Sequence, residues 1–311
     1  MLRPNPNVAF IAAGGGARAI AHLGVLRACE EVGLAPGVMV GAGTGALVAA
    51  LYGQHVTLDV LLDAYRLPWR RRHRGPRLEW HDFFGPPKFA HLLRPGYLLS
   101  GLFGLDRLER HLARVLPGND FRRAPMPIYI VALDIDAARP LIFGPGYRAD
   151  VPISQAVAAS CCWPGLFRPY RAGGVYCVGG DFAVHAAPAL GAEAGATLVL
   201  LSNTYRAEAS AGGRRSLVRG GGLRVMRQAF GALMHDNGRL GALELAGRER
   251  APAIVEIEPD LGPRPYLDAL AARRLVLRGY REGLRRLAEA RRQGLWGGEH
   301  EGGPTAGAPA T

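Results

Sequence analysis

The chain has 311 residues, 49 % of them hydrophobic, which excludes a disordered protein and allows one large domain or two small ones. Its 38 basic and 26 acidic residues give a formal net charge of +12, and Lys88 is the only lysine. This arginine-rich balance fits a solvated basic surface or attraction to anionic lipid headgroups. The sequence leaves both alternatives open.

The four cysteines form no CxxC pair, and Cys161 and Cys162 are adjacent. This spacing predicts buried thiols in a reducing compartment, rather than a zinc site or a disulfide framework. The first residues lead almost directly into an apolar segment, and Gly, Pro or charged residues interrupt every stretch of about 20 apolar residues. We therefore expect no signal peptide, no transmembrane helix and a cytoplasmic location, with peripheral membrane contact as an option.

The first predicted elements alternate between strand and helix. Residues 8–13 (VAFIAA) predict a buried strand, and residues 17–32 carry apolar side chains at helical spacing. A second strand over 37–40 and a helix over 44–52 repeat the pattern, which is typical of an α/β fold with a parallel sheet. Residues 53–120 are less regular and predict an inserted cap region.

The later elements continue this organisation. Predicted strands cover 127–134, 175–178, 197–202 and 254–259. Predicted helices cover 102–116, 153–163, 222–236, 238–247 and 266–293, the last with a break near Gly279. Residues 206–221 read as a polar loop. We expect an N-terminal tail over 1–7, a single domain over 8–293 and a disordered tail over 294–311.

A glycine-rich segment follows the first predicted strand. Residues 14–18 read Gly-Gly-Gly-Ala-Arg, and glycines at a helix N-terminus let backbone N–H groups point at an anion. The segment also fits a dinucleotide-binding pattern, which calls for an acidic residue after the next strand. That strand ends in Val40-Gly41-Ala42, without an acid. A nucleotide-binding module therefore remains only as a weaker alternative.

Several segments, in order, resemble a known family. GGGARAIAHLGVLRACEEVGL and then VGAGTGALVAALYG are similar to the opening of the patatin-like phospholipases, which read GGGxRG, HxGVL and then GTSxGAL. IYIVALDID, ending a strand at Asp134, AVAASCCWPGLFRPY, GGVYCVGGDF and LVLRGYREGLRRL follow in the family's order. The resemblance spans about residues 8–288. It implies a three-layer α/β/α sandwich with a mostly parallel central sheet.

The resemblance also implies site residues. In that family a serine on a tight elbow attacks a lipid ester, an aspartate activates it, and the glycine-rich loop forms the oxyanion hole. Here the serine position is Gly43, and the aspartate position, counted without gaps, is Val178. Neither side chain can perform the family's chemistry. The loop and elbow positions that are retained are Gly14, Gly15, Gly16, Arg18, Gly41 and Gly45.

Two residues are candidate substitutes for the missing pair. Thr44 adjoins the nucleophile position, although a hydroxyl there also suits the first turn of a helix. Asp181 lies three residues beyond Val178, and a turn carboxylate is the alternative for it. For His22 and Ser160 we expect structural hydrogen bonds rather than acid–base chemistry.

The expected partners follow from the family and from charge. A lipid or acyl ligand is expected, together with peripheral contact with an anionic membrane. No cofactor, no metal and no specific nucleic acid is expected. The side chains that suit phosphate or acyl contacts, each with a solvated or packed role as the alternative, are Arg70, Arg71, Arg72, Arg74, Arg214, Arg215, Arg219, Trp80, Phe83 and Phe84.

The sequence thus predicts a patatin-like protein that is catalytically inactive, with a lipid-binding or regulatory role. An active lipid acyl hydrolase that uses Thr44 or Asp181 is the main alternative. The prediction of inactivity depends on the simultaneous loss of the serine at Gly43 and the aspartate at Val178.

Overall fold

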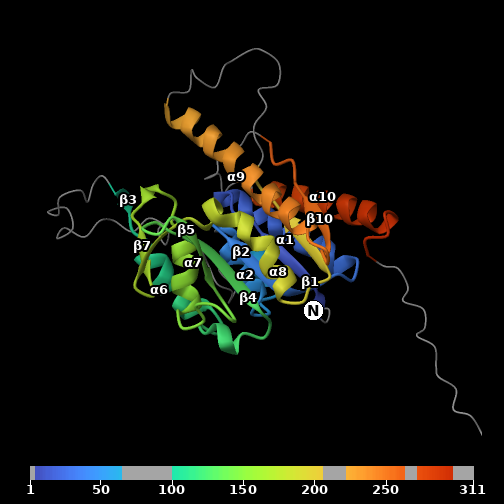
Figure 1. Ribbon diagram of the computed structural model, residues 1–311, viewed down its shortest axis with the longest axis horizontal. Helices are drawn as coiled ribbons and strands as arrows, with labels where there is room; N and C mark the ends of the chain where they lie inside the picture. Colours follow the sequence, from blue (N-terminus) through green and yellow to red (C-terminus); the bar gives the residue numbers. More distant parts are fainter. Residues whose placement is uncertain (1–3, 65–99, 206–221, 263–271, 297–311) are drawn as a thin grey trace, which may run out of the picture.

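The computed structural model describes residues 4–64, 100–205, 222–262 and 272–296 (Figure 1). The strands are β1 (Asn5–Ala12), β2 (Pro36–Ala42), β3 (Gly101–Phe103), β4 (Ile128–Asp134), β5 (Arg139–Phe143), β6 (Gly165–Phe167), β7 (Tyr170–Ala172), β8 (Val175–Val178), β9 (Leu198–Ser202) and β10 (Ala253–Ile257). The helices are α1 (Ala21–Glu31), α2 (Gly45–Tyr52), α3 (Leu58–Ala64), α6 (Asp106–Val115), α7 (Ile153–Ser160), α8 (Ala187–Glu193), α9 (Gly222–Ala246) and α10 (Ala272–Arg292). Three 3-10 helices are η1 (Gly16–Ile20), η2 (Phe121–Arg123) and η3 (Gly180–Ala186).

The central sheet is mixed, with a parallel core. Its strand order is β10-β9-β1-β2-β4-β8-β7, and β5 also pairs with β4. The pairs from β10 to β4 are parallel, whereas β5, β7 and β8 are joined by antiparallel pairing. The fold is therefore α/β with a mostly parallel sheet, as the sequence predicts.

Helices cover both faces of the sheet. Alternate side chains of β1 point to opposite sides, as expected for a strand: Phe10 joins the core beneath α1, α2, α7 and α10, whereas Ile11 joins the core beneath α8 and α9. The continuous apolar runs of the parallel strands arise from this burial on both faces. The three-layer arrangement predicted from the family resemblance is confirmed.

The two long C-terminal helices differ from the prediction. The structure has one continuous helix α9 where two helices are predicted, and α10 continues through Gly279. Gly238, where the second of the two predicted helices begins, and Gly279 are both places where another segment packs closely against the helix, rather than helix ends. A Cβ atom at Gly238 would lie 3.2 Å from Asn203 Nδ2, and one at Gly279 would overlap the carbonyl oxygen of Ala21 in α1.

Several predicted segments lie partly or wholly outside the described residues. They are residues 65–99 of the predicted cap, the basic run 70–74, Trp80, Phe83, Phe84, the arginines at 214, 215 and 219, the first part of the 266–293 helix, and most of the 294–311 tail. Within the described residues, no helix combines the length and the apolarity needed to cross a membrane. The cytoplasmic location stays a prediction.

Candidate active site

The candidate site lies where β1 and β2 end. These parallel strands are neighbours, so their carboxyl ends share one edge of the sheet, where α/β folds usually bind ligands. The glycine loop of residues 13–16 follows β1, and the elbow of residues 43–44 follows β2. The start of η3, which carries Asp181, is the third component. The topology thus brings together three segments that are far apart in the sequence.

The backbone of the glycine loop is held by side chains. His22 Nε2 contacts the carbonyl oxygen of Ala13, Thr204 Oγ1 donates to Gly14, and Thr44 Oγ1 donates to the carbonyl oxygen of Gly16 at 3.0 Å. In a planar trans peptide the C=O and the following N–H point in opposite directions. Anchoring these three carbonyls inside the protein therefore turns the N–H groups that follow them the other way, as an anion-binding loop requires.

His22 has the structural role that the sequence predicts. Its ring is fully buried, and Nδ1 lies 2.8 Å from Ser202 Oγ. Because a carbonyl oxygen can only accept, Nε2 carries the proton and Nδ1 accepts from the serine hydroxyl. Burial lowers the pKa of His22 to about 4. The ring is therefore neutral near pH 7 and serves as a fixed strut behind the loop.

The elbow residue Gly43 has a backbone conformation that favours glycine. Its φ is 55°, in the left-handed region. A Cβ atom placed at this position would overlap the carboxyl group of Asp181, to which its three nearest atoms all belong. A Cβ at Gly14 would also overlap this carboxyl group. Asp181 thus fills the space where the side chain of a nucleophile at position 43 would begin.

Asp181 is a buried carboxyl group that contacts both the loop and the elbow. It is 4 % exposed. Burial is the strongest influence on it and raises the pKa of Asp181 to about 7, against hydrogen bonds with the Tyr205 side chain and the Gly14 backbone N–H, which favour the charged form. Near neutral pH the group therefore exists in both protonation states. It can accept a proton or donate one within contact of the elbow.

The other substitute, Thr44, is committed elsewhere. It is the N-cap residue of α2, but its side chain makes no capping hydrogen bond, because the hydroxyl donates to Gly16 instead. Val178 is buried at the end of β8, opposite Leu133 of β4. The structure therefore brings Asp181 to the elbow, while Val178 completes a strand pair.

The remaining predicted site residues serve the framework. A Cβ at Gly41 would overlap α2, and one at Gly45 would overlap the carbonyl oxygen of Ala12, so both glycines let α2 pack closely on the sheet. Arg18 is buried and its Nη2 donates to the carbonyl oxygen of Gly262 at 2.9 Å. Ser160 donates to the carbonyl oxygen of Val131 at 2.6 Å, inside the core, which matches its expected structural role.

Sequence reasoning misses the residues that support the site from afar. Ser202 ends β9, and Thr204 and Tyr205 follow it; β9 lies beside β1 in the sheet. The polar residues 202–205 (SNTY), at the end of a buried strand, are a signal that could have been interpreted once the strand order was known. Cys161 is also missed: its thiol lies 3.4 Å from the carbonyl oxygen of Gly43. Burial raises the pKa of Cys161 well above its ordinary value, and nearby Asp181 adds to the shift, so the thiol stays protonated and unreactive.

Within the residues that the structure describes, no group of three or more His, Cys, Asp or Glu side chains is placed to hold a metal ion. The four cysteines are all buried and unpaired, as predicted. The chemical groups that remain at the site are the backbone N–H groups of the loop and the carboxyl group of Asp181.

Comparison with known proteins identifies the family. The sequence profile of the patatin-like phospholipases matches residues 11–190. An uncharacterized NTE family protein of Mycobacterium tuberculosis is 24 % identical over 174 residues, which are 55 % of this chain and 41 % of that protein. The triacylglycerol lipase ptl3 of Schizosaccharomyces pombe is 26 % identical over 52 % of this chain and 34 % of its own length. This chain thus matches well under half of the length of either relative.

A shorter match and two structures complete the comparison. Lysophospholipase NTE1 of Pyricularia oryzae is 43 % identical over 49 residues, which are 16 % of this chain and 3 % of that protein. VipD from Legionella pneumophila aligns with 92 % of this chain and 67 % of its own, at 14 % identity and a TM-score of 0.44. The type III effector ExoU aligns with 92 % of this chain and 53 % of its own, at 16 % identity and a TM-score of 0.40. Because the family profile covers more than half of the residues, this chain belongs to the patatin-like phospholipase family.

Proposed function

We propose that this chain is a non-hydrolytic member of the patatin-like phospholipases that binds lipid. The observation that carries the proposal is the position of Asp181. Its carboxyl group lies where the side chain of a nucleophile would start at Gly43, and it contacts the glycine loop at Gly14. The place of the nucleophile is thus filled by a carboxyl group that also lies against the glycine loop.

The neighbouring hydroxyl and thiol groups do not supply a replacement nucleophile. Attack on an ester needs a group that a base can deprotonate and that can reach the carbonyl carbon. The Thr44 hydroxyl donates its proton to the Gly16 carbonyl oxygen, which is not a base. The Cys161 thiol is buried, and its pKa is raised. These contacts support the loss of hydrolysis, whereas the retained loop supports the binding of a carbonyl or anionic group.

A lipid ligand is the second part of the proposal. The names of two relatives say that those proteins are a lysophospholipase and a triacylglycerol lipase, and this chain shares their family. Next to Asp181, the partly buried rings of Trp163, Phe182 and Phe230 lie with centroids 5.7 to 6.0 Å apart. An aromatic cluster that includes the residue after Asp181 suits contact with an acyl chain.

The domain organisation follows the same reasoning. We propose one domain over the predicted residues 8–293, extended at its start to Asn5, where β1 begins. The reason is that β9 and β10 lie beyond the matched residues 11–190 and yet extend the same sheet. The predicted cap over 53–120 is described only in part. Its described helix α6 packs against α7 in the main body, which supports an insertion into this domain.

An active hydrolase is the second candidate, and one observation favours it. Asp181, with a pKa raised to about 7, sits against the elbow in the protonation range that suits a general base. For Asp181 to activate Thr44, the Thr44 hydroxyl would have to break its hydrogen bond to the carbonyl oxygen of Gly16. The aspartate would then extract its proton while the loop stabilised the charge that develops on the ester oxygen.

Ester hydrolysis separates the two candidates. We expect the purified full chain to release p-nitrophenol from p-nitrophenyl butyrate at the same rate as its Asp181→Asn and Thr44→Val variants, all at the level of the buffer with an unrelated protein. The valine keeps the shape of threonine and removes only its hydroxyl. Release by the unmodified chain that falls at least about tenfold in either variant would establish the active hydrolase and contradict the proposal.

A further inference from the structure

Helix α9 carries apolar side chains on the side that faces away from the fold. Among the described residues, twelve large hydrophobic side chains are exposed, and five of them belong to this one helix. Met226, Leu233, Leu240 and Leu243 are between 48 % and 64 % exposed. The helix packs against α8 and η3, and Met234, on its opposite side, is fully buried. Because the exposed side chains are gathered on one element, this surface calls for a partner of its own.

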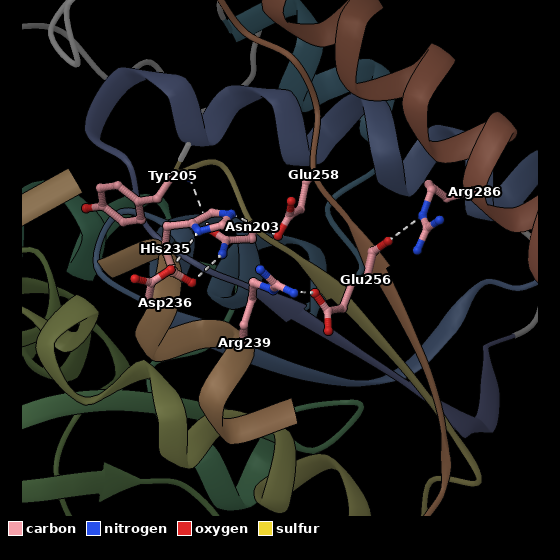
Figure 2. Close-up of polar contacts among 8 residues, drawn as sticks. All are labelled: Asn203, Tyr205, His235, Asp236, Arg239, Glu256, Glu258 and Arg286. Carbon is pink, nitrogen blue, oxygen red and sulfur yellow. Dashed lines mark hydrogen bonds and ion pairs between the residues drawn. The ribbon is translucent and has the colours of Figure 1, made fainter. Parts of the chain in front are cut away.

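One flank of α9 is held against the end of β10 (Figure 2). His235 Nε2 lies 3.1 Å from Glu258 Oε1, and Arg239 Nε lies 3.6 Å from Glu256 Oε2. Asn203, just after β9, donates to the carbonyl oxygen of His235 at 3.2 Å. These contacts fix the rotation of α9 about its own axis. The exposed apolar side chains are therefore kept outward.

The exposed positions follow the spacing of a helix that pairs with another helix. Apolar residues at the first and fourth positions of a seven-residue repeat form the line along which two helices pack. We call the residues at these positions of α9 the outer stripe: Met226, Ala229, Leu233, Asp236, Leu240 and Leu243, all of them exposed. A stripe of this width fits a second helix. The aspartate in its middle disfavours an anionic lipid surface.

Two charged side chains near the middle of the outer stripe favour a second copy of this chain as the partner. The side chains of Asp236, in the stripe, and Arg239, on its flank, are 77 % and 53 % exposed. When two identical surfaces meet about a two-fold axis, residue i contacts residue j and residue j contacts residue i. An axis midway between positions 236 and 239 of two antiparallel helices brings Asp236 of each copy to Arg239 of the other.

The same alignment also pairs the apolar residues. With the axis at this point, Leu233 of each copy lies opposite Leu243 of the other to within one residue, which is about 1.5 Å along a helix. One arrangement thus covers the leucines and gives the aspartate a partner of opposite charge. The net charge of +12 on each copy opposes association over longer distances, where salt screens it, whereas the paired side chains would be in contact.

We propose that two copies of this chain associate through the outer stripe of α9, with the two helices packed antiparallel about a two-fold axis. The proposal does not depend on lipid binding, but it bears on the candidate site. Phe230 is partly buried, lies one helical turn before Leu233 and stacks at 5.7 Å against Phe182 and at 6.0 Å against Trp163. The second copy would therefore lie beside the aromatic cluster.

Size-exclusion chromatography with light scattering tests the association. We expect the full chain to be a dimer at concentrations up to about 0.1 mM. The Leu233→Glu/Leu240→Glu variant should form a dimer at least about tenfold more weakly, because pairing would bury its new carboxylates. Leu277→Glu is the matched control. It adds the same charge to an exposed leucine of α10 and should dimerise like the unmodified chain.

Charge reversal tests the identity of the partner and the direction of the helices. Asp236→Arg and Arg239→Asp should each weaken the dimer, because each brings like charges together across the axis. Mixing these two variants should restore dimers that contain one copy of each, because both contacts then join opposite charges. Native mass spectrometry identifies such mixed dimers. Any damage to folding by the single substitutions would persist in the mixture and could not produce this recovery.

Several results would overturn the inference. They are a monomeric unmodified chain, equal dimerisation by the Leu233→Glu/Leu240→Glu variant, and single charge variants that weaken the dimer without recovery in the mixture. If the unmodified chain is monomeric and sediments with vesicles containing phosphatidylglycerol, and the leucine variant does not, the outer stripe binds lipid instead. Glutamine at positions 233 and 240 repeats the test without added charge if the glutamates impair folding. Ester hydrolysis would contradict the proposed function but leave this result unchanged, because light scattering measures association alone.

Discussion

Gly43→Ser is expected to give this chain esterase activity well above that of the Gly43→Ala variant. The new hydroxyl would be placed on the elbow, beside the carboxyl group of Asp181 and in front of the glycine loop. General-base activation contributes about 10²–10⁴-fold to such reactions. We expect an increase of this size in p-nitrophenyl butyrate hydrolysis over the Gly43→Ala variant. The additional substitution Val178→Asp should not be needed for this activity. Val178 pairs with Leu133 in the sheet, and Asp181 supplies the carboxyl group at the elbow.

Gly43→Ala is the matched control for this prediction. Both substitutions add a Cβ that overlaps Asp181 and forces its carboxyl group to rotate, and both place an L residue at a φ of 55°, at a cost of about 1–2 kcal/mol. They differ only in the hydroxyl. The double variant Gly43→Ser/Asp181→Asn should return to the level of Gly43→Ala. If Gly43→Ser is no faster than Gly43→Ala, the site has diverged in more than its nucleophile.

Asp181→Asn is expected to make the protein more stable above neutral pH. A carboxyl group whose pKa rises from 3.8 to about 7 on folding stabilises the native state fully below its unfolded pKa. This contribution, about 4 kcal/mol, is lost as the pH rises from about 4 to 7, because the unfolded chain releases the proton first. Asparagine has a similar shape and no charge, so we expect a gain approaching this size at pH 8.

The titration of His22 changes the free energy of unfolding with pH in the opposite direction to that of Asp181, over nearly the same pH range. Its pKa falls from 6.5 to about 4 on folding, so the unfolded chain binds the proton first as the pH falls. The native state therefore loses about 3 kcal/mol between pH 6.5 and 4. In the unmodified chain the two effects nearly cancel. In Asp181→Asn the slope from His22 should appear alone.

Urea unfolding from pH 4 to 8 measures both effects. The free energy of unfolding of Asp181→Asn should rise with pH up to about 6.5, while that of the unmodified chain stays nearly level. Asp136→Asn changes an exposed carboxyl group and should follow the unmodified chain. Parallel curves for Asp181→Asn and the unmodified chain would contradict a raised pKa of the buried Asp181 carboxyl group.

The parallel core of the fold could be predicted from the sequence because its signals are local. The run VAFIAA and the glycines after it specify a buried strand and a turn, and β1 forms at Asn5–Ala12. The antiparallel strands β5 and β7 could not be predicted, since Arg139–Phe143 is only partly buried and Tyr170–Ala172 has three residues. Such strands are defined by their partners rather than by an apolar run of their own.

The candidate site was predictable in part for a similar reason. The sequence shows directly that position 43 carries no nucleophilic group, because glycine has no side chain in any conformation. The position of the carboxyl group at the elbow could not be predicted by counting residues along the sequence without gaps, which leads to Val178. The backbone between β8 and η3 turns after Val178, and it is Asp181 that contacts Gly14 and Gly43. A shift of three residues in a turn leaves little trace in a single sequence.

The absence of a nucleophile is tested most directly by intact mass spectrometry after treatment with a fluorophosphonate, which forms a covalent bond with an activated hydroxyl. The unmodified chain should keep its mass, and Gly43→Ser should gain one adduct that maps to position 43. An adduct on the unmodified chain, at Thr44 or at any other residue, would contradict the account and show that a working nucleophile remains.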